Sequence, residues 1–177
     1  MIPYGRQDIT PEDIAAVEAS VSEMNPQAQI HRCDSPVTVE GAESVAGKRV
    51  IVIEDGPTLT HGSMTFGAGV VGASAARVAS IVDPSPYAVG SLAATYAKYP
   101  NARGVLPAMG YSDEQIGDLT ATIAATPAEA IVSGTPIDLT RVISVEIPLV
   151  RARYELRERE PGRLRAALDA VLDAPRG

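Results

Sequence analysis

A short run of β-branched residues limits the fold of this chain more than any other feature. Residues 49–53 have the sequence Arg-Val-Ile-Val-Ile, and the turn-forming group Glu54-Asp55-Gly56-Pro57 follows them directly. A continuous run of this kind is typical of a strand that is covered on both faces. Such strands occur mostly in parallel sheets with helices on each side, so this segment favours an α/β fold.

The chain after this strand repeats a strand–helix rhythm. Residues 79–82 are predicted to be another buried strand, and residues 104–108 and 130–133 are predicted to be strands. A capping box of Ser112 and Gln115 marks the start of an intervening helix. Strands that alternate with helices of about 12 residues indicate a parallel sheet with right-handed crossovers. We therefore predict a three-layer α/β fold, with a mainly parallel sheet and helices on both faces. Its ligand crevice should lie beyond the carboxyl ends of the strands.

Capping residues mark two further helices. Thr10 followed by Pro11 predicts a helix start, because a hydroxyl at the N-cap accepts a backbone amide and proline suits the first helical position. Asn25-Pro26 should end this helix, since proline disfavours helical geometry in the residue before it. Ser85 is expected to cap another helix, and the inner face of that helix consists of Val89, Leu92, Ala93 and Tyr96.

The C-terminal part breaks the strand–helix rhythm. Residues 142–147 and 149–156 are predicted to be a pair of extended segments hinged at the proline between them, and an amphipathic helix follows. We therefore expect an α/β domain over residues 1–160 and a C-terminal helix over residues 161–177. That helix is suited either to cap the sheet or to meet a partner.

The charge balance and composition argue against several classes of function. The chain has 15 basic and 22 acidic residues and a net charge of −7, which opposes attraction to nucleic acid or anionic lipid. No stretch approaches the roughly 20 apolar residues of a membrane span, and the first residues lack the order of a signal peptide. Cys33 is the single cysteine, so an internal disulfide and a cysteine-based zinc cluster are excluded. We expect a cytoplasmic protein that binds neither nucleic acid nor membrane.

The densest group of reactive side chains follows the buried strand directly, over residues 54–64. One interpretation is a phosphate-binding loop, in which hydroxyls and backbone amides receive phosphate oxygens and His61 transfers a proton near neutral pH. The alternative is a turn in which Asp55 and Thr58 bond their own backbone and His61 is partly exposed. We take Asp55 and His61 as candidate catalytic residues. The candidate substrate-binding residues of this segment are Thr58, Thr60, Gly62 and Ser63.

Other candidate substrate-binding residues follow the other predicted strands, and they are Asp83, Tyr87, Thr135 and Asp138. If the sheet is parallel, these residues face the same crevice. Alternatively, Asp83 only stops a strand and Asp138 only starts a helical turn. Arg151 and Arg153 share one face of an extended segment, which suits phosphate or carboxylate binding, although pairing with nearby glutamates is an alternative.

Residues 67–72 match the G-x-G-x-x-G dinucleotide motif, but their context differs from that motif. The motif should follow its strand directly, whereas a polar segment separates the two here, and Asp83 comes too soon to bind a ribose. Glycines that let a helix lie close to the sheet are the better explanation. The G-x-x-x-x-G-K-[ST] pattern that cradles β- and γ-phosphates does not occur in the chain, so we expect it to bind no nucleotide cofactor alone.

Four segments carry a family resemblance, and they are residues 52–62, 81–84 with 87–91, 105–112, and 134–139. Together they resemble the cyclic 2,3-diphosphoglycerate synthetase family, many members of which are labelled only as predicted GTPases. The likeness runs from about Ile9 to Glu158. Family members are larger cytoplasmic proteins in which a Rossmann-like region and a P-loop region precede this portion. Where relatives carry an Asn-Lys-x-Asp motif before the first helix, this chain has Gly5-Arg6-Gln7-Asp8.

The resemblance implies an ATP-dependent ligase that closes a diphosphorylated acid into a cyclic anhydride, with ATP and Mg²⁺ needed only by the full-length family. This chain would be the half that binds the phosphorylated acid, inactive without a P-loop nucleotide-binding partner. The alternative is a stand-alone phosphometabolite-binding or regulatory module. In both cases we expect a homo-oligomer or a partner-bound state, with the C-terminal helix as the contact surface.

Overall fold

The computed structural model describes residues 9–61 and 64–173 and forms two compact units. The first, which we call the sheet unit, comprises Val37–Tyr154. The second, which we call the terminal unit, combines the described residues before Val37 with those from Glu155 onward. This division differs from the expected boundary at residue 160, because the N-terminal helix and the C-terminal helix belong to the same unit.

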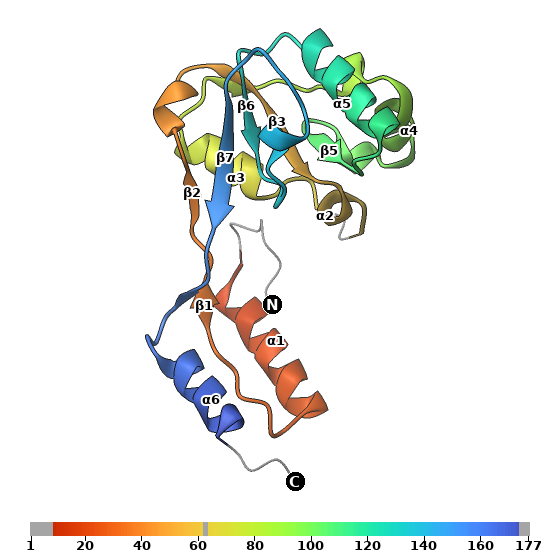
Figure 1. Cartoon of the computed structure of the whole chain (residues 1–177). Helices are drawn as coiled ribbons and strands as arrows, with labels where there is room; N and C mark the ends of the chain where they lie inside the picture. The colour runs from red at the N-terminus through yellow and green to blue at the C-terminus, as the bar shows by residue number, and fades with distance from the viewer. Residues whose placement is uncertain (1–8, 62–63, 174–177) are drawn as a thin grey trace. The chain divides into compact units, whose positions relative to one another are not determined.

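The sheet unit is built on a six-stranded sheet, in which all neighbouring strands are parallel except for one antiparallel edge strand. The central strand has one neighbour on one side, and two short strands pair with its first and second halves on the other (Figure 1). The path across the sheet runs from β2 (Val37–Val39) through β7 (Leu149–Tyr154), β6 (Ala130–Ser133) and β3 (Arg49–Asp55) to β4 (Ser80–Ile81), with β5 (Leu106–Ala108) also on β3.

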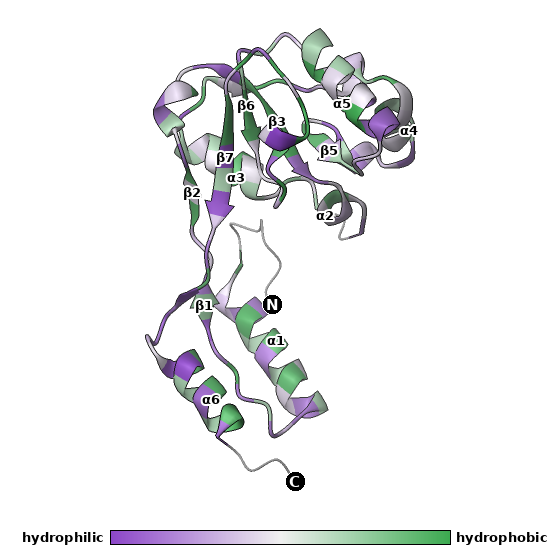
Figure 2. Cartoon of the chain, in the orientation of Figure 1, coloured by the Kyte–Doolittle hydropathy of each residue, from purple (hydrophilic) through white to green (hydrophobic). Residues whose placement is uncertain are grey.

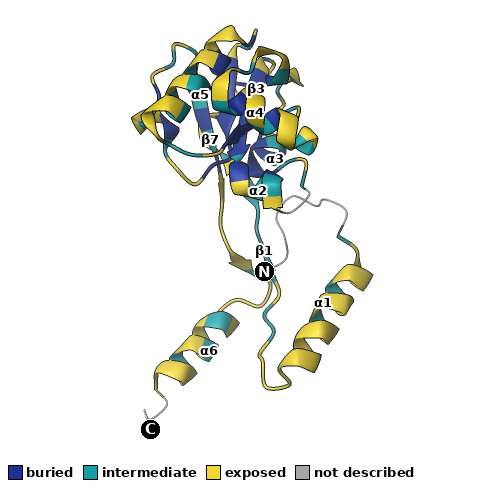
Figure 3. Ribbon diagram, turned by 90° about the vertical axis from the view of Figure 1, so that its right-hand side faces the viewer, coloured by how far each residue is buried: buried dark blue, intermediate teal, exposed yellow. Residues whose placement is uncertain are grey.

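The β-branched residues of β3 alternate between two hydrophobic cores. Val50 and Val52 pack in a core that includes residues of α3 (Ala68–Ala75), whereas Ile51 and Ile53 pack with residues of α4 (Gly90–Lys98) and α5 (Asp113–Ala125). All four side chains are fully buried, and Figure 3 shows the buried sheet between more exposed helices. The predicted three-layer architecture is therefore confirmed.

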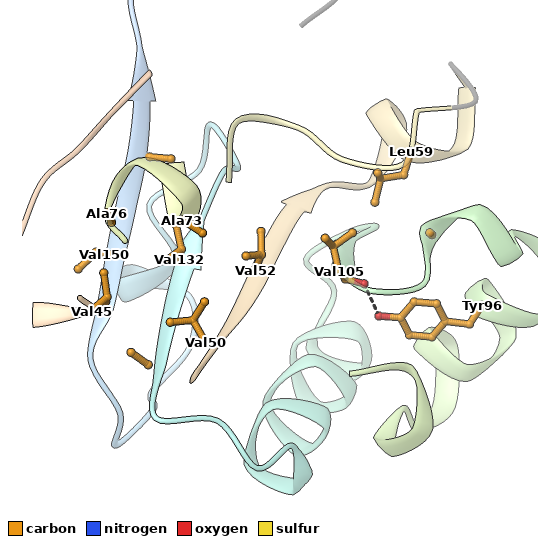
Figure 4. Close-up of a cluster of buried hydrophobic side chains, with 13 residues drawn as sticks. Val45, Val50, Val52, Leu59, Ala73, Ala76, Tyr96, Val105, Val132 and Val150 are labelled. Atoms are coloured by element: carbon orange, nitrogen blue, oxygen red, sulfur yellow. Dashed lines mark hydrogen bonds between the residues drawn. The ribbon is translucent and has the colours of Figure 1, made fainter. Parts of the chain in front are cut away.

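Tyr96 supplies the polar contact within the first of these cores. Its hydroxyl donates a hydrogen bond of 2.6 Å to the backbone carbonyl of Val105, as Figure 4 shows. Burial raises the pKa of Tyr96, with a smaller contribution from the charge of Asp83. The phenol therefore stays neutral and serves as a donor that fixes α4 to the segment before β5.

The helix starts were predicted with mixed success. The capping box of Ser112 and Gln115 at the start of α5 is confirmed, as is the cap of α1 (Pro11–Met24) by Thr10. The cap of α4 by Ser85 was wrong, because Ser85 begins the separate 3₁₀ turn η2 (Ser85–Tyr87). The first turn of α4 instead bonds to Asp118 of α5, which accepts the Ser91 amide at 2.7 Å. On the predicted inner face, Leu92 and Tyr96 are buried, but Val89 and Ala93 are exposed.

Two predicted strands also differ from the structure. Strand β4 has only two residues and is partly exposed, so residues 79–82 form a short edge strand instead of a buried one. Residues 142–147 form no strand, because a 3₁₀ turn, η4 (Leu139–Arg141), precedes them and Ile143 packs into the second core. The C-terminal part instead contains β7, which pairs with β2 and β6, and β8 (Arg157–Glu158), which pairs with β1 (Cys33–Asp34). The remaining short elements are η1 (Ala42–Ser44), α2 (Gly56–His61) and η3 (Pro100–Ala102).

The terminal unit consists of α1, α6 (Arg163–Leu172) and a small antiparallel pair of strands, β1 (Cys33–Asp34) and β8. Cys33 is the first residue of β1, and it is free and partly buried. Neither helix contains a buried residue, and Figure 2 shows apolar residues on both. The exposed apolar side chains include Val17, Met24, Leu168, Val171 and Leu172.

Within the described residues, no helix combines the length and the hydropathy needed to cross a bilayer.

Candidate functional site

The sheet register places three polar side chains of adjacent strands near the carboxyl ends of β3 and β6. Ile53 of β3 lies opposite Ser133 of β6, and Ser133 lies opposite Arg151 of β7. Asp55 follows Ile53 by two residues and therefore points to the same face of the sheet. That face is the one covered by α4 and α5, since Ile53 packs in their core. Asp55, Ser133 and Arg151 thus gather at one edge of one face.

Two further hydroxyl groups join this edge. The Thr135 hydroxyl is buried, lies 3.2 Å from the Ser133 hydroxyl and donates to the Ile137 carbonyl at 3.1 Å. Tyr111 lies close to Thr135 and Asp55, and both affect its pKa. Burial raises the pKa of Tyr111, the nearby Thr135 hydroxyl lowers it, and the charge of Asp55 raises it, so that the pKa is raised overall. We call Asp55, Tyr111, Ser133, Thr135 and Arg151 the strand-end site.

Arg151 is fixed at this site by only part of its guanidinium group. Its Nη2 donates to the Pro136 carbonyl at 2.9 Å, whereas its buried Nε has no hydrogen-bond partner among the described residues. Asp138 caps η4 by accepting the Thr140 amide and hydroxyl. The pKa of Asp138 is lowered by these bonds and, to a smaller extent, by the charge of Arg151. Asp138 therefore starts a helical turn, as one sequence interpretation held, while it also lies near Arg151.

The segment after Asp55 is helical, whereas the sequence analysis expected a loop. Residues 56–61 form α2, in which the Thr60 hydroxyl donates to the Gly56 carbonyl at 3.1 Å and lies 3.0 Å from His61 Nδ1. The Thr58 hydroxyl reaches Asp55 at 3.4 Å, and His61 is exposed. The Thr60 hydroxyl thus has its contacts inside the helix, whereas the Thr58 hydroxyl bonds to the last residue of β3. Their role in binding stays a prediction. Gly62 and Ser63 lie outside the described residues.

Glu54 is the important polar residue that sequence reasoning did not select. The residue is 1% exposed, and its carboxylate accepts the backbone amides of Gly67 at 2.9 Å, Gly69 at 3.2 Å and Val70 at 2.9 Å. Burial raises the pKa of Glu54, the three amides oppose that shift, and the charge of Asp55 adds to it, so that the pKa is raised overall. The start of α3, which could bind an anionic ligand in another protein, holds this carboxylate instead.

This contact also explains the glycine motif at residues 67–72. A methyl group added to Gly67 would lie 2.6 Å from a Glu54 carboxylate oxygen, and one on Gly69 would lie 2.7 Å from the Val52 side chain. One on Gly72 would lie 2.8 Å from the Ala152 and Val39 side chains. The interpretation that these glycines let a helix lie close to the sheet is therefore confirmed. The sequence signal for Glu54 was the pairing of a buried strand end with a glycine-rich helix start.

Asp83 makes a separate network instead of joining the strand-end site. Strand β4 pairs only with the beginning of β3, Ile81 lying opposite Val50, so Asp83 lies level with the middle of β3. Its carboxylate accepts the Ser85 amide and hydroxyl, each at 2.9 Å, and the Gly104 amide at 3.1 Å. Burial alone would raise the pKa of Asp83, but these bonds lower it below the ordinary value. Tyr87, at the end of the neighbouring turn η2, is 38% exposed.

We expect Asp83→Ala to destabilise the fold, because the Gly104 and Ser85 groups lose their acceptor. The loss should be about 1–2 kcal/mol near neutral pH, since Asp83 is exposed and solvent weakens its contribution. The stabilisation by Asp83 is present above the unfolded-state pKa and is lost as the pH falls through the lower folded-state value. Urea unfolding as a function of pH measures both effects. Unchanged stability with loss of ligand binding would instead make Asp83 a binding residue.

Arg153 is also engaged elsewhere. Its Nε forms an ion pair with Glu40 at 2.8 Å, and both side chains are about half exposed. Arg151 and Arg153 lie two residues apart on the same strand, yet they have different partners. The two side chains therefore do not point to one shared binding position, and the prediction that both bind substrate stays untested. Arg151 is the better candidate, because part of its guanidinium group has no partner among the described residues.

No group of three or more histidine, cysteine, aspartate or glutamate side chains suited to hold a metal ion occurs within the described part of the chain. A hollow of about 370 Å³ lies apart from the strand-end site, beside α4. It is lined mainly by apolar groups, from Ser85, Pro86, Ala93, Tyr96, Ala97 and Arg103. Its lining includes none of the sequence-predicted site residues.

Comparison with known proteins finds one informative relationship. No family model matches the chain, and no solved structure matches it. The chain is 46% identical over 158 residues to a protein from Thermococcus kodakarensis named arginine synthetase ArcE. The match covers 89% of this chain but 35% of the relative, so the chain spans about a third of the relative's length. The relative is not named as a cyclic 2,3-diphosphoglycerate synthetase, and what the comparison supports is similarity to part of a synthetase.

Proposed function

We propose that this chain is the acceptor-substrate portion of an ATP-dependent synthetase and that it works only together with a nucleotide-binding portion. Its similarity to part of arginine synthetase ArcE supports a synthetase. The chain has no G-x-x-x-x-G-K-[ST] sequence, so ATP and Mg²⁺ would be held by the other portion. The observation that carries the proposal is the convergence of Asp55, Tyr111, Thr135 and Arg151 at the carboxyl edge of a parallel sheet.

The charges at the strand-end site favour an amino acid as the substrate or product. Arg151 offers a guanidinium group for a carboxylate, and Asp55 offers a carboxylate for an ammonium or guanidinium group. The Tyr111 and Thr135 hydroxyls add neutral hydrogen-bonding groups beside them. This combination matches arginine itself, the compound in the relative's name, or a precursor that has the same amino-acid end.

A phosphorylated acid, which the family resemblance implies, is the second candidate. A diphosphorylated acid carries several negative charges, whereas the strand-end site has Arg151 as its cation and Asp55 and Asp138 as nearby anions. That balance is less favourable to a polyanion, because close like charges repel. His61, exposed at the end of α2, would supply a further group to a phosphate. In this case the chain is a phosphometabolite-binding or regulatory module, or the acceptor half of an anhydride-forming ligase.

The role of a partner follows from the same proposal. A nucleotide-binding portion must bring the γ-phosphate of ATP to the acceptor, and a second protein or a further part of the same protein could supply it. The exposed apolar side chains of α1 and α6 are suited to contact such a partner or a second copy of the chain. Asp55 and His61 remain the candidates for proton transfer at the acceptor.

Calorimetry on the isolated chain tests this proposal. We expect arginine to bind, and we expect neither binding nor hydrolysis of Mg-ATP or Mg-GTP, because the phosphate cradle is missing from the sequence. Titration with 2,3-diphosphoglycerate tests the second candidate in parallel. Binding of this compound without binding of arginine would replace the first candidate by the second. Nucleotide turnover by the isolated chain that is abolished by Asp55→Ala would contradict the proposal that another portion binds the nucleotide.

A further inference from the structure

The guanidinium group of Arg151 has an unused hydrogen-bond donor at the strand-end site. Its Nε is buried and has no partner within the described residues, while Nη2 donates to the Pro136 carbonyl at 2.9 Å. Nη2 carries a second hydrogen, so the Nε–Nη2 edge of the group is only partly satisfied. A buried donor without an acceptor is costly, and a ligand oxygen at that edge would remove the cost.

Another arginine of the same chain shows what this edge binds when it is filled. Arg32 binds the Glu18 carboxylate side-on, with Nε at 2.6 Å from one oxygen and Nη2 at 2.7 Å from the other. Such two-point contacts are the usual way in which arginine recognises a carboxylate. Arg153, two residues from Arg151, also uses its Nε on a glutamate. Arg151 differs from both in having no carboxylate on its Nε.

The position of Arg151 is suited to a substrate. The residue lies opposite Ser133 in the parallel pair of β6 and β7, next to the buried hydroxyl of Thr135 and on the same sheet face as Asp55. It is partly exposed as a whole, although Nε itself is shielded. An oxyanion therefore reaches Nε after a shift of the arginine side chain or of Pro136, whose carbonyl holds Nη2.

We infer that Arg151 is the specificity-determining residue that binds the carboxylate of the substrate through Nε and Nη2. The inference rests on the proposed function, because it takes the substrate to be an amino acid. It places the carboxylate end of that amino acid beside Arg151 of β7 and the cationic end beside Asp55 of β3. A phosphate oxygen offers the same oxyanion chemistry, and the test below separates the two sources.

The test compares arginine with agmatine, which is arginine without its carboxylate, as ligands of the full chain. The variants are Arg151→Lys, which keeps the charge but not the two-point contact, and the control Arg153→Gln on the same strand. Wild type should bind arginine more tightly than agmatine. Arg151→Lys should weaken arginine binding by about tenfold to a hundredfold and leave agmatine binding nearly unchanged. Arg153→Gln should change both affinities by less than about twofold.

Each outcome bears on a different claim. If Arg151→Lys binds arginine as tightly as wild type, or loses arginine and agmatine equally while its unfolding curve is unchanged, the inference is wrong. If wild type binds inorganic phosphate but not arginine, and Arg151→Lys loses the phosphate, the oxyanion role of Arg151 stands and the amino-acid substrate is rejected. If wild type binds neither probe, both the inference and the proposed function fail.

Discussion

Replacing Glu54 with leucine is expected to remove most of the stability of the sheet unit. The amides of Gly67, Gly69 and Val70 would be buried without an acceptor, because the Glu54 carboxylate now accepts all three. Each unsatisfied buried amide costs roughly 1–3 kcal/mol, and a whole domain is stable by only about 5–15 kcal/mol. Unfolding in urea, followed by circular dichroism, measures the loss.

Glu129→Leu provides the matched control for this prediction. Glu129 also accepts a backbone amide, that of Arg49 at 3.0 Å, but its side chain is 48% exposed and water can replace it. Its replacement should cost much less stability than the replacement of Glu54. Equal losses in the two variants would show that the amide contacts of Glu54 are not important for stability.

The pH dependence of stability gives a second measure of Glu54. Its pKa is raised in the folded state, chiefly by burial, so the part of its contribution that depends on protonation is favourable below the ordinary value of 4.5. That contribution is lost as the pH rises through the higher folded-state pKa. Glu54→Gln should therefore show a weaker loss of stability than wild type over this rise in pH, although it is less stable overall because its amide group faces backbone donors.

Gly134→Ala is expected to be the second strongly destabilising change. A methyl group at this position would overlap the Glu54 carboxylate and the backbone nitrogen of Gly69. Neither group can move without breaking the contact that joins β3 to α3. We expect a loss of about 1–3 kcal/mol or more in the free energy of unfolding.

Gly117→Ala is the control with the opposite expected sign. Gly117 lies inside α5, and a methyl group there would meet nothing within 4 Å. Alanine should stabilise this helix by about 0.5–1 kcal/mol, since it loses less conformational entropy than glycine. If the two glycine variants behave alike, the tight packing around Gly134 is not a property of the protein in solution.

The parts of the fold that depend on local sequence were predictable. The β-branched run of β3 and the capping box of α5 both formed as expected, because their signals lie within a few residues. The start of α4 was not predictable in this way. Its first turn bonds to Asp118, which lies 27 residues beyond Ser91 along the chain and becomes a neighbour only when α4 and α5 pack together.

The candidate site was likewise predictable only in part from the local sequence. Asp55 and Thr135 come together because Asp55 ends β3 and Thr135 follows β6 in the parallel sheet, which the strand–helix rhythm predicted. Arg151 lies within β7 and joins them because it pairs opposite Ser133. Asp83 was expected beside them, but the two-residue pairing of β4 places it too far back along β3. Strand register and the choice of partner across the sheet depend on contacts between distant segments, so no local pattern reveals them.

The most direct test of the account is to map the amide chemical shifts of the ¹⁵N-labelled chain during titration with arginine. The account predicts that the largest shifts occur at Asp55, Tyr111, Thr135 and Arg151, which the sheet brings to one edge. Shifts at Arg153 should be smaller, since Glu40 already occupies its guanidinium group. Shifts confined to the terminal unit, from Glu155 onward or in α1, would contradict a substrate site at the carboxyl ends of the strands.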